Sequence, residues 1–169
     1  MLGFYANFPK TIHGIKHFAV SVSIKKLQQV LVETFQKLNN ETLSLESIAD
    51  PSIPQCKVNL EFGIAEAGDF NYLNGEEENR VQKEIRKKPF QVLDFLCAVR
   101  YYRMQEERKT PLRFDYYMLR FTFGEDSMDM QVFHERGPRY LSPEDVINIV
   151  CNKVNETFSK RILKALDAS

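Results

Sequence analysis

The chain is poor in the residue types that phosphate-binding loops and cross-linked folds need. Seven of its 169 residues are glycine, and none is arranged as in a P-loop or a Rossmann dinucleotide-binding turn. The three cysteines, Cys56, Cys97 and Cys151, are odd in number, far apart and set in apolar patterns. We therefore expect neither a disulfide framework nor a zinc site, and we predict no metal and no cofactor.

An excess of charge of one sign is also missing. Lys plus Arg and Asp plus Glu both number 23, which gives a net charge of +0. Such a chain has no global field that attracts nucleic acid or an anionic membrane, so binding of that kind needs a local patch. No apolar run approaches the roughly 20 residues of a membrane-spanning helix, and the first nine residues do not resemble a signal peptide. We expect a cytoplasmic protein with no membrane partner.

The apolar pattern predicts one α+β domain over residues 1–169. Its antiparallel β-sheet packs against two to three helices, one of them a long C-terminal helix. A single domain of this length buries roughly 70% of the surface of its unfolded chain, enough for a core without cross-links. Expected strands cover 57–64, 112–123 and 128–135, expected helices cover 24–39 and 142–166, and a long surface loop is expected at 39–55.

The last third of the chain carries the clearest pattern. Apolar residues alternate in 113–118 and again in 119–123, but with opposite parity, which indicates a bulge or two apolar faces. The turn residues at 124–127 and the alternation in 128–135 complete a β-hairpin. Ser142 is placed as an N-cap with Pro143 in the first helical position, and an apolar stripe continues to Leu166.

Other segments are less distinct. Ser23 caps the expected helix at 24–39, and a strand at 18–22 should lead into it, pairing with residues 2–8. The stretch 93–102 satisfies both strand and helix spacing; its β-branched and aromatic residues favour a strand. The charged stretch 76–88 places acids first and bases last, as the dipole of a solvated helix prefers.

The strongest site candidate is the loop at 134–140, with His134, Arg136, Arg139 and Tyr140 as candidate anion-binding residues. Two guanidinium groups close to a helix N-terminus suit a phosphate or carboxylate. The alternative is that both arginines pair with Glu144 and Asp145, which already place negative charge at that helix end. His134, beside Glu135, is also a candidate general base or simply a histidine at the edge of the core.

No activated nucleophile or acid/base pair stands out, so no catalytic residue is predicted and an enzyme is the less favoured class. The leading hypothesis is a binding or assembly module that forms a homodimer or contacts a protein partner through a second apolar surface. Nine of the twenty Phe and Tyr residues lie between Phe90 and Phe123, and four of the five methionines between Met104 and Met130. This enrichment allows a second function, apolar-ligand binding in a cavity lined by methionine and aromatic side chains.

Two further alternatives remain. One is RNA or phosphate-ligand binding through the 134–140 loop. Bases and rings that interleave along the neighbouring segments would support it: Arg100, Tyr101, Tyr102, Arg103, Arg113, Tyr117 and Arg120. The segment 112–123 lacks the glycines of the RNP1 signature, however, and acidic residues are mixed among the arginines. The last alternative is a hydrolase that uses His134.

Overall fold

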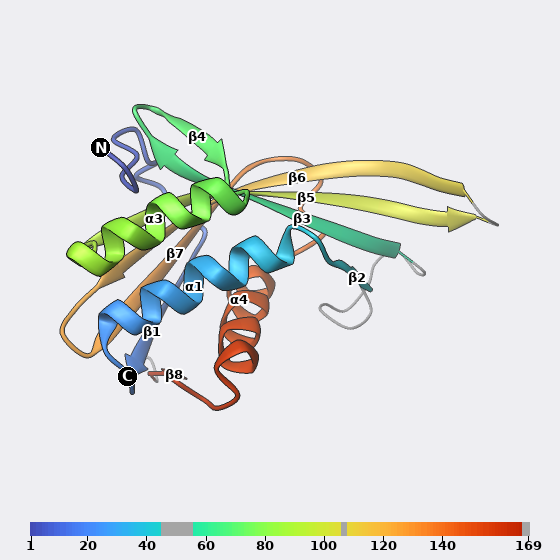
Figure 1. The fold of residues 1–169 in the computed structure, drawn as a ribbon. Coiled ribbons are helices and arrows are strands. Elements are labelled where there is room, and N and C mark those ends of the chain that lie inside the picture. The colour runs from blue at the N-terminus through green and yellow to red at the C-terminus, as the bar shows by residue number, and fades with distance from the viewer. Residues whose placement is uncertain (45–55, 106–107, 167–169) are drawn as a thin grey trace.

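An antiparallel β-sheet forms the body of the computed structural model, which describes residues 1–44, 56–105 and 108–166 (Figure 1). In these ranges the sheet has eight strands in the order β2-β3-β5-β6-β7-β1-β8, with β4 paired to β3. The elements are β1 (Gly14–Val20), α1 (Ile24–Leu38), β2 (Thr42–Ser44), β3 (Cys56–Glu66), β4 (Asp69–Tyr72), α3 (Gly75–Lys87), β5 (Val92–Gln105), β6 (Arg108–Phe123), β7 (Ser127–Arg136), α4 (Pro143–Phe158) and β8 (Leu163–Ala165). The predicted α+β class is confirmed.

The core lies between the helices and one face of the sheet. Figure 1 shows α1 and α3 crossing this face, while the hairpin of β5 and β6 extends beyond them. At the centre, Phe35 of α1 stacks on Phe62 of β3 with ring centroids 4.1 Å apart, and meets Phe95 of β5 edge-on at 4.9 Å. Buried residues of α3 and α4 join the same cluster. Each helix of the described ranges is too short or too polar to cross a membrane.

Side-chain caps fix where the helices begin. Ser23 accepts a hydrogen bond from the backbone of Lys26, which confirms the predicted start of α1. Ser142 and Asp145 form a reciprocal capping box at the start of α4. Asn74 caps α3, which confirms the solvated helix predicted at 76–88. These caps satisfy backbone N–H groups that the first helical turn leaves unpaired.

The predicted end of the C-terminal helix is wrong. The helix stops at Phe158 rather than at residue 166, because Ser159 adopts the left-handed conformation at φ +59°. The Asn155 side chain then accepts hydrogen bonds from the backbones of Ile162 and Leu163, at 2.9 and 3.0 Å, and turns the chain back toward β1. Ile162 stays buried, so the apolar stripe continued in sequence without continuing in the helix.

The strands agree with the sequence-based predictions in some places and differ in others. The ambiguous stretch 93–102 is a strand, within β5. The strand expected at 18–22 is β1, which starts and ends earlier. Residues 2–8 do not pair with it; Gly3 bridges Ala65 of β3 and Asp94 of β5 through 2.7 Å backbone hydrogen bonds. The loop expected at 39–55 contains strand β2, which pairs with β3, and positions 45–55 of it lie outside the described residues.

The change of apolar parity in β6 reflects two apolar faces, one of the two predicted alternatives. The register between β6 and β7 shifts between Tyr116 and Tyr117. After the shift, Tyr117 and Leu119 point into the helix-covered core, where both are fully buried. Phe114 and Tyr116 point to the other face of the sheet, which we call the outward face. The residue without a partner at this shift is Glu135 of β7, whereas the side chains of β6 alternate regularly, with Asp115 on the same face as Tyr117. The parity change in β6 therefore comes from a second apolar surface and not from a bulge of β6 at this point.

Candidate functional site

The loop at 134–140 is organised around a buried carboxylate, Asp115 of β6. Asp115 has no exposed surface. Its two oxygens accept hydrogen bonds from the backbone N–H groups of Arg139 and Tyr140, at 2.7 and 3.0 Å, and from the hydroxyl of Tyr101 at 2.6 Å. His134 Nε2 lies 2.8 Å from the same carboxylate. A charge buried this deeply is tolerated because several donors share it.

The close approach of this loop to β6 depends on glycine. Gly137 has φ +113°, and a Cβ atom there would lie 2.3 Å from both Asp115 Oδ1 and the carbonyl oxygen of Phe114. No other residue type fits without displacing the loop. On the far side, the Tyr117 hydroxyl donates to the carbonyl of Leu141 at 2.6 Å. The cluster joins the loop to the sheet.

Both tyrosine hydroxyls of this cluster keep their protons. Burial is the main reason that the pKa of Tyr101 and that of Tyr117 lie far above the usual value for tyrosine, and the Asp115 charge raises them further. Protonated hydroxyls are the donors that Asp115 and the Leu141 carbonyl need. Both hydroxyl donors of the cluster therefore have acceptors within it.

The four residues predicted for the anion site separate in the structure. The His134 side chain is 12% exposed and belongs to the Asp115 cluster. Arg139 and Tyr140 contribute backbone N–H groups to it, while the side chain of Arg139 is exposed. Arg136 lies on the outward face. Among the described residues, neither arginine forms an ion pair with Glu144 or Asp145, which was the alternative interpretation.

The outward face carries a row of planar side chains, which we call the arginine–aromatic row. Its members, from β5 across β6 to β7, are Tyr102, Arg100, Phe114, Tyr116 and Arg136. The Arg100 guanidinium lies 5.8 Å from the Tyr102 ring centroid and 5.2 Å from that of Phe114. The Phe114 and Tyr116 centroids are 6.3 Å apart at an interplanar angle of 17°, and Arg136 lies 4.2 Å over Tyr116. Planar groups thus follow one another across three strands.

Strand register produces this row. Arg100 pairs with Phe114, and Tyr116 pairs with Arg136 across the next ladder. Phe114 and Tyr116 are two residues apart on β6, so their side chains leave the same face about 6.6 Å apart. Phe114 is 39% exposed. A shallow hollow of about 600 Å³ lies beside the row, lined by Arg113, Phe114, Tyr116, Arg136, Gly137 and Pro138.

The row is locally cationic although the chain is neutral. The hydrogen bond to the Tyr102 hydroxyl, 2.7 Å long, is the main cause that raises the pKa of Arg100. Glu61 lies 3.6 Å from Arg100 and balances part of its charge. In the ranges that the structure describes, Arg113 and Arg136 have no carboxylate partner. Positive charge therefore remains beside the exposed rings.

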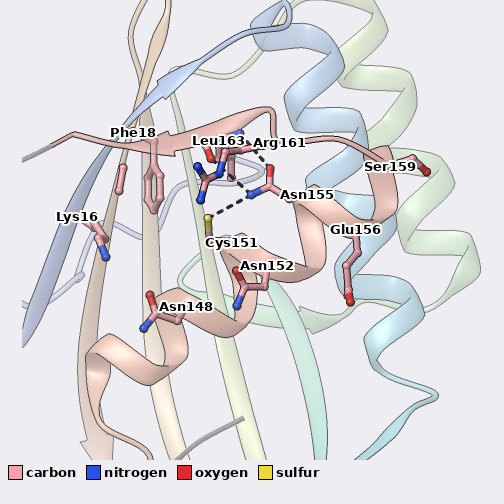
Figure 2. Close-up of a pocket in the computed structure, with 11 residues that line it drawn as sticks. Lys16, Phe18, Asn148, Cys151, Asn152, Asn155, Glu156, Ser159, Arg161 and Leu163 are labelled. Atoms are coloured by element: carbon pink, nitrogen blue, oxygen red, sulfur yellow. Dashed lines mark hydrogen bonds between the residues drawn. The ribbon is translucent and has the colours of Figure 1, made fainter. Parts of the chain in front are cut away.

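A second hollow, of about 660 Å³, lies on the other side of the molecule between β1, α4 and β8 (Figure 2). Figure 2 shows Lys16 and Arg161 pointing toward it from opposite walls, with Cys151 between them. Burial raises the pKa of the Cys151 thiol, while the charges of Lys16 and Arg161 act on the same thiol in the opposite direction. Both cations line the same groove as this thiol.

Sequence reasoning missed Asp115 and the groove. Asp115 occupied a polar position in an alternating strand, and the parity change that follows it was the one signal that its side chain turns inward. His13 and His17 have separate partners: His13 Nδ1 accepts a hydrogen bond from the His134 backbone, and His17 contacts Asp129 at 2.6 Å. Among the described residues, no three His, Cys, Asp or Glu side chains are grouped to hold a metal ion.

Comparison with protein-family models, with curated proteins and with solved structures gives no match. Function must therefore be argued from the two surfaces themselves.

Proposed function

We propose that the protein binds single-stranded nucleic acid on the arginine–aromatic row. The observation that carries this proposal is the succession of planar and cationic groups across β5, β6 and β7, at centroid distances of 4.2 to 6.3 Å. Proteins that bind single strands combine rings on which bases stack with a positively charged path for the backbone. The predicted 134–140 loop contributes to this surface through Arg136.

Phe114 and Tyr116 provide the stacking element. Their rings are nearly parallel, and the distance between them is close to twice the ~3.4 Å spacing of stacked bases. A base between the two rings requires only a small opening. Every base has a π face, so this contact selects for unpaired bases rather than for a sequence.

Arg100 and Arg136 of the row, with Arg113 at the edge of the neighbouring hollow, provide the charge. Guanidinium groups bind phosphate oxygens in a bidentate manner and also stack on bases. Because the net charge of the chain is +0, attraction to the nucleic acid comes from this patch alone. We therefore expect modest affinity that falls steeply with salt, since bound cations on the nucleic acid compete with the three arginines. The setting is a cytoplasmic protein without a catalytic role.

The test is fluorescence anisotropy with a short labelled oligouridine at ~50 and ~200 mM salt. The double variant Phe114→Ala/Tyr116→Ala should bind at least about tenfold more weakly, since stacking contributes ~1–3 kcal/mol per base. Tyr72→Ala is the matched control, because Tyr72 is 52% exposed but lies on β4, outside the row. Unchanged binding by the double variant, or no binding by the wild type at low salt, contradicts the proposal.

A homodimer through the same face is the second candidate. Ile15 of β1 is 50% exposed and Phe114 is 39% exposed, so apolar surface extends along the outward face as an assembly contact requires. Light scattering distinguishes the two. A dimer that dissociates in Ile15→Lys favours assembly, and a monomer that binds oligouridine favours the nucleic-acid surface.

A further inference from the structure

We propose that the groove between β1, α4 and β8 is a separate binding site for a small organic anion, a carboxylate or a phosphate monoester. Its volume of about 660 Å³ lies in the ordinary range of ligand pockets, roughly 300–1,000 Å³. Three elements wall it: β1, one side of α4, and the segment from Arg161 to Ala165.

Two cations face this groove. Lys16 is half-buried and Arg161 is exposed, and neither forms an ion pair within the described ranges. Lys16 and Arg161 line the same groove as Cys151, and the charge of each lowers the pKa of its thiol against the larger effect of burial. Glu156 is the carboxylate that lines the groove, and Lys153 lies 3.5 Å from it. Within the described residues, the charges of the groove that lack an ion-pair partner are therefore the positive ones, those of Lys16 and Arg161.

Uncharged groups complete the site. Asn148 and Asn152 are exposed and lie one helical turn apart on α4, so both amides are on the groove side and can donate to an anion (Figure 2). Asn155 is committed to the fold through the backbones of Ile162 and Leu163. Phe18 and Leu163 add apolar surface. A ligand with an anionic end and a compact apolar or aromatic body fits this combination.

This site is independent of the arginine–aromatic row. Lys16 and Phe18 lie on the side of β1 that faces α4, whereas the row lies on the outward face of β5, β6 and β7. No residue lines both hollows. Loss of one function therefore leaves the other measurable.

Cys151 offers a direct readout, because its half-buried thiol lies on the groove floor. In the full chain with Cys56→Ser, Cys97 stays protected, since burial raises the pKa of its thiol far above the usual value. The experiment follows iodoacetamide labelling by intact mass spectrometry in the presence of inorganic phosphate, citrate or adenosine monophosphate. Adenosine and sodium chloride at matched ionic strength are the controls, because screening alone changes thiolate content.

We expect citrate, adenosine monophosphate or both to slow labelling of Cys151 several-fold, and adenosine and chloride not to. In Lys16→Gln/Arg161→Gln the protecting anion should be needed at about tenfold or higher concentration, because charged hydrogen bonds are lost. Lys164→Gln, an exposed cation on β8 outside the groove, should behave as wild type. Thermal melting confirms that each variant is folded, and Arg161→Lys should retain protection if the double variant does not fold.

Equal labelling with and without all three anions overturns the proposal. So does protection that persists in the folded double variant, because the anion then acts elsewhere. Protection by inorganic phosphate, with loss in the double variant, supports the site and identifies phosphate as the recognised group. Protection by citrate alone identifies a carboxylate ligand.

Discussion

Arginine stacks on aromatic rings at both ends of the outward face, with opposite consequences. At the end nearest the N-terminus, Arg120 lies 4.4 Å from the Phe8 ring and 5.2 Å from the Phe4 ring. At the other end, Arg136 lies 4.2 Å over Tyr116. The stacking is alike, yet one arginine is 22% exposed and the other is on the surface.

The difference is the carboxylate. Arg120 donates to both oxygens of fully buried Asp94, at 2.7 and 2.8 Å, and to the Tyr5 carbonyl at 3.0 Å. Tyr5 in turn donates its backbone N–H to Asp94. The N-terminal segment therefore covers the Arg120 guanidinium, whose charge is paired with Asp94 and whose Nε and Nη2 atoms donate to Asp94 and Tyr5. Arg136 has no such partner among the described residues, so the same pair of side chains can serve a ligand.

Removing the carboxylate at the closed end should give the largest effect. Asp94→Ala leaves Arg120 partly buried beside two rings without its counter-charge, and breaks the link to the N-terminal segment. The free energy of unfolding should fall by about 3–5 kcal/mol, the cost of breaking a buried ion pair on one side. Urea denaturation followed by circular dichroism measures it.

The matched control is Glu61→Ala at the open end. Glu61 also faces an arginine, at 3.6 Å from Arg100, but its side chain is 46% exposed. Loss of this pair should cost less than about 1 kcal/mol. If both alanine variants lose the same stability, burial of the carboxylate does not separate the two ends and the comparison fails.

Gly137→Ala tests the boundary between the open end and the Asp115 cluster. The new Cβ would meet the Phe114 carbonyl and Asp115 at 2.3 Å, so the loop must move. We expect a loss of about 2 kcal/mol or more, and faster hydrogen exchange at the Arg139 and Tyr140 amides. Gly68→Ala isolates the backbone contribution, because Gly68 has φ +80° with open space around it and should lose only about 1 kcal/mol.

Much of the fold followed from local signals in the sequence. Alternation located β3, β6 and β7, and serine caps located the starts of α1 and α4, because strand pleat and helix capping are decided by residues close together in the chain. The end of α4 did not follow. The apolar stripe continues to Leu166, but the helix ends where Ser159 adopts the left-handed conformation, and Asn155 then binds the returning segment.

The candidate sites show the same limit more strongly. The sequence pointed to the loop at 134–140. It could not show that the carboxylate of Asp115, nineteen residues before His134, forms hydrogen bonds with that loop. In the sequence, Arg120 and Arg100 are equivalent cations, each close to aromatic residues. Only pairing across strands shows that Asp94 occupies the first. Tertiary contacts decide which charged side chains stay free to bind a ligand. The spacing of residues along the chain does not show these contacts.

Arg136→Ala should have the smallest effect on stability and a clear effect on binding. Its guanidinium is exposed and its contact with Tyr116 is a surface cation–π interaction, so the free energy of unfolding should change by less than about 1 kcal/mol. Arg120→Ala, with the same stacking but a buried partner, should lose more. Oligouridine affinity should order the two variants the other way, because only Arg136 is available to phosphate. If Arg136→Ala destabilises the fold as strongly as Arg120→Ala, Arg136 has a structural role as well. That result contradicts the proposal that the arginine–aromatic row binds a ligand.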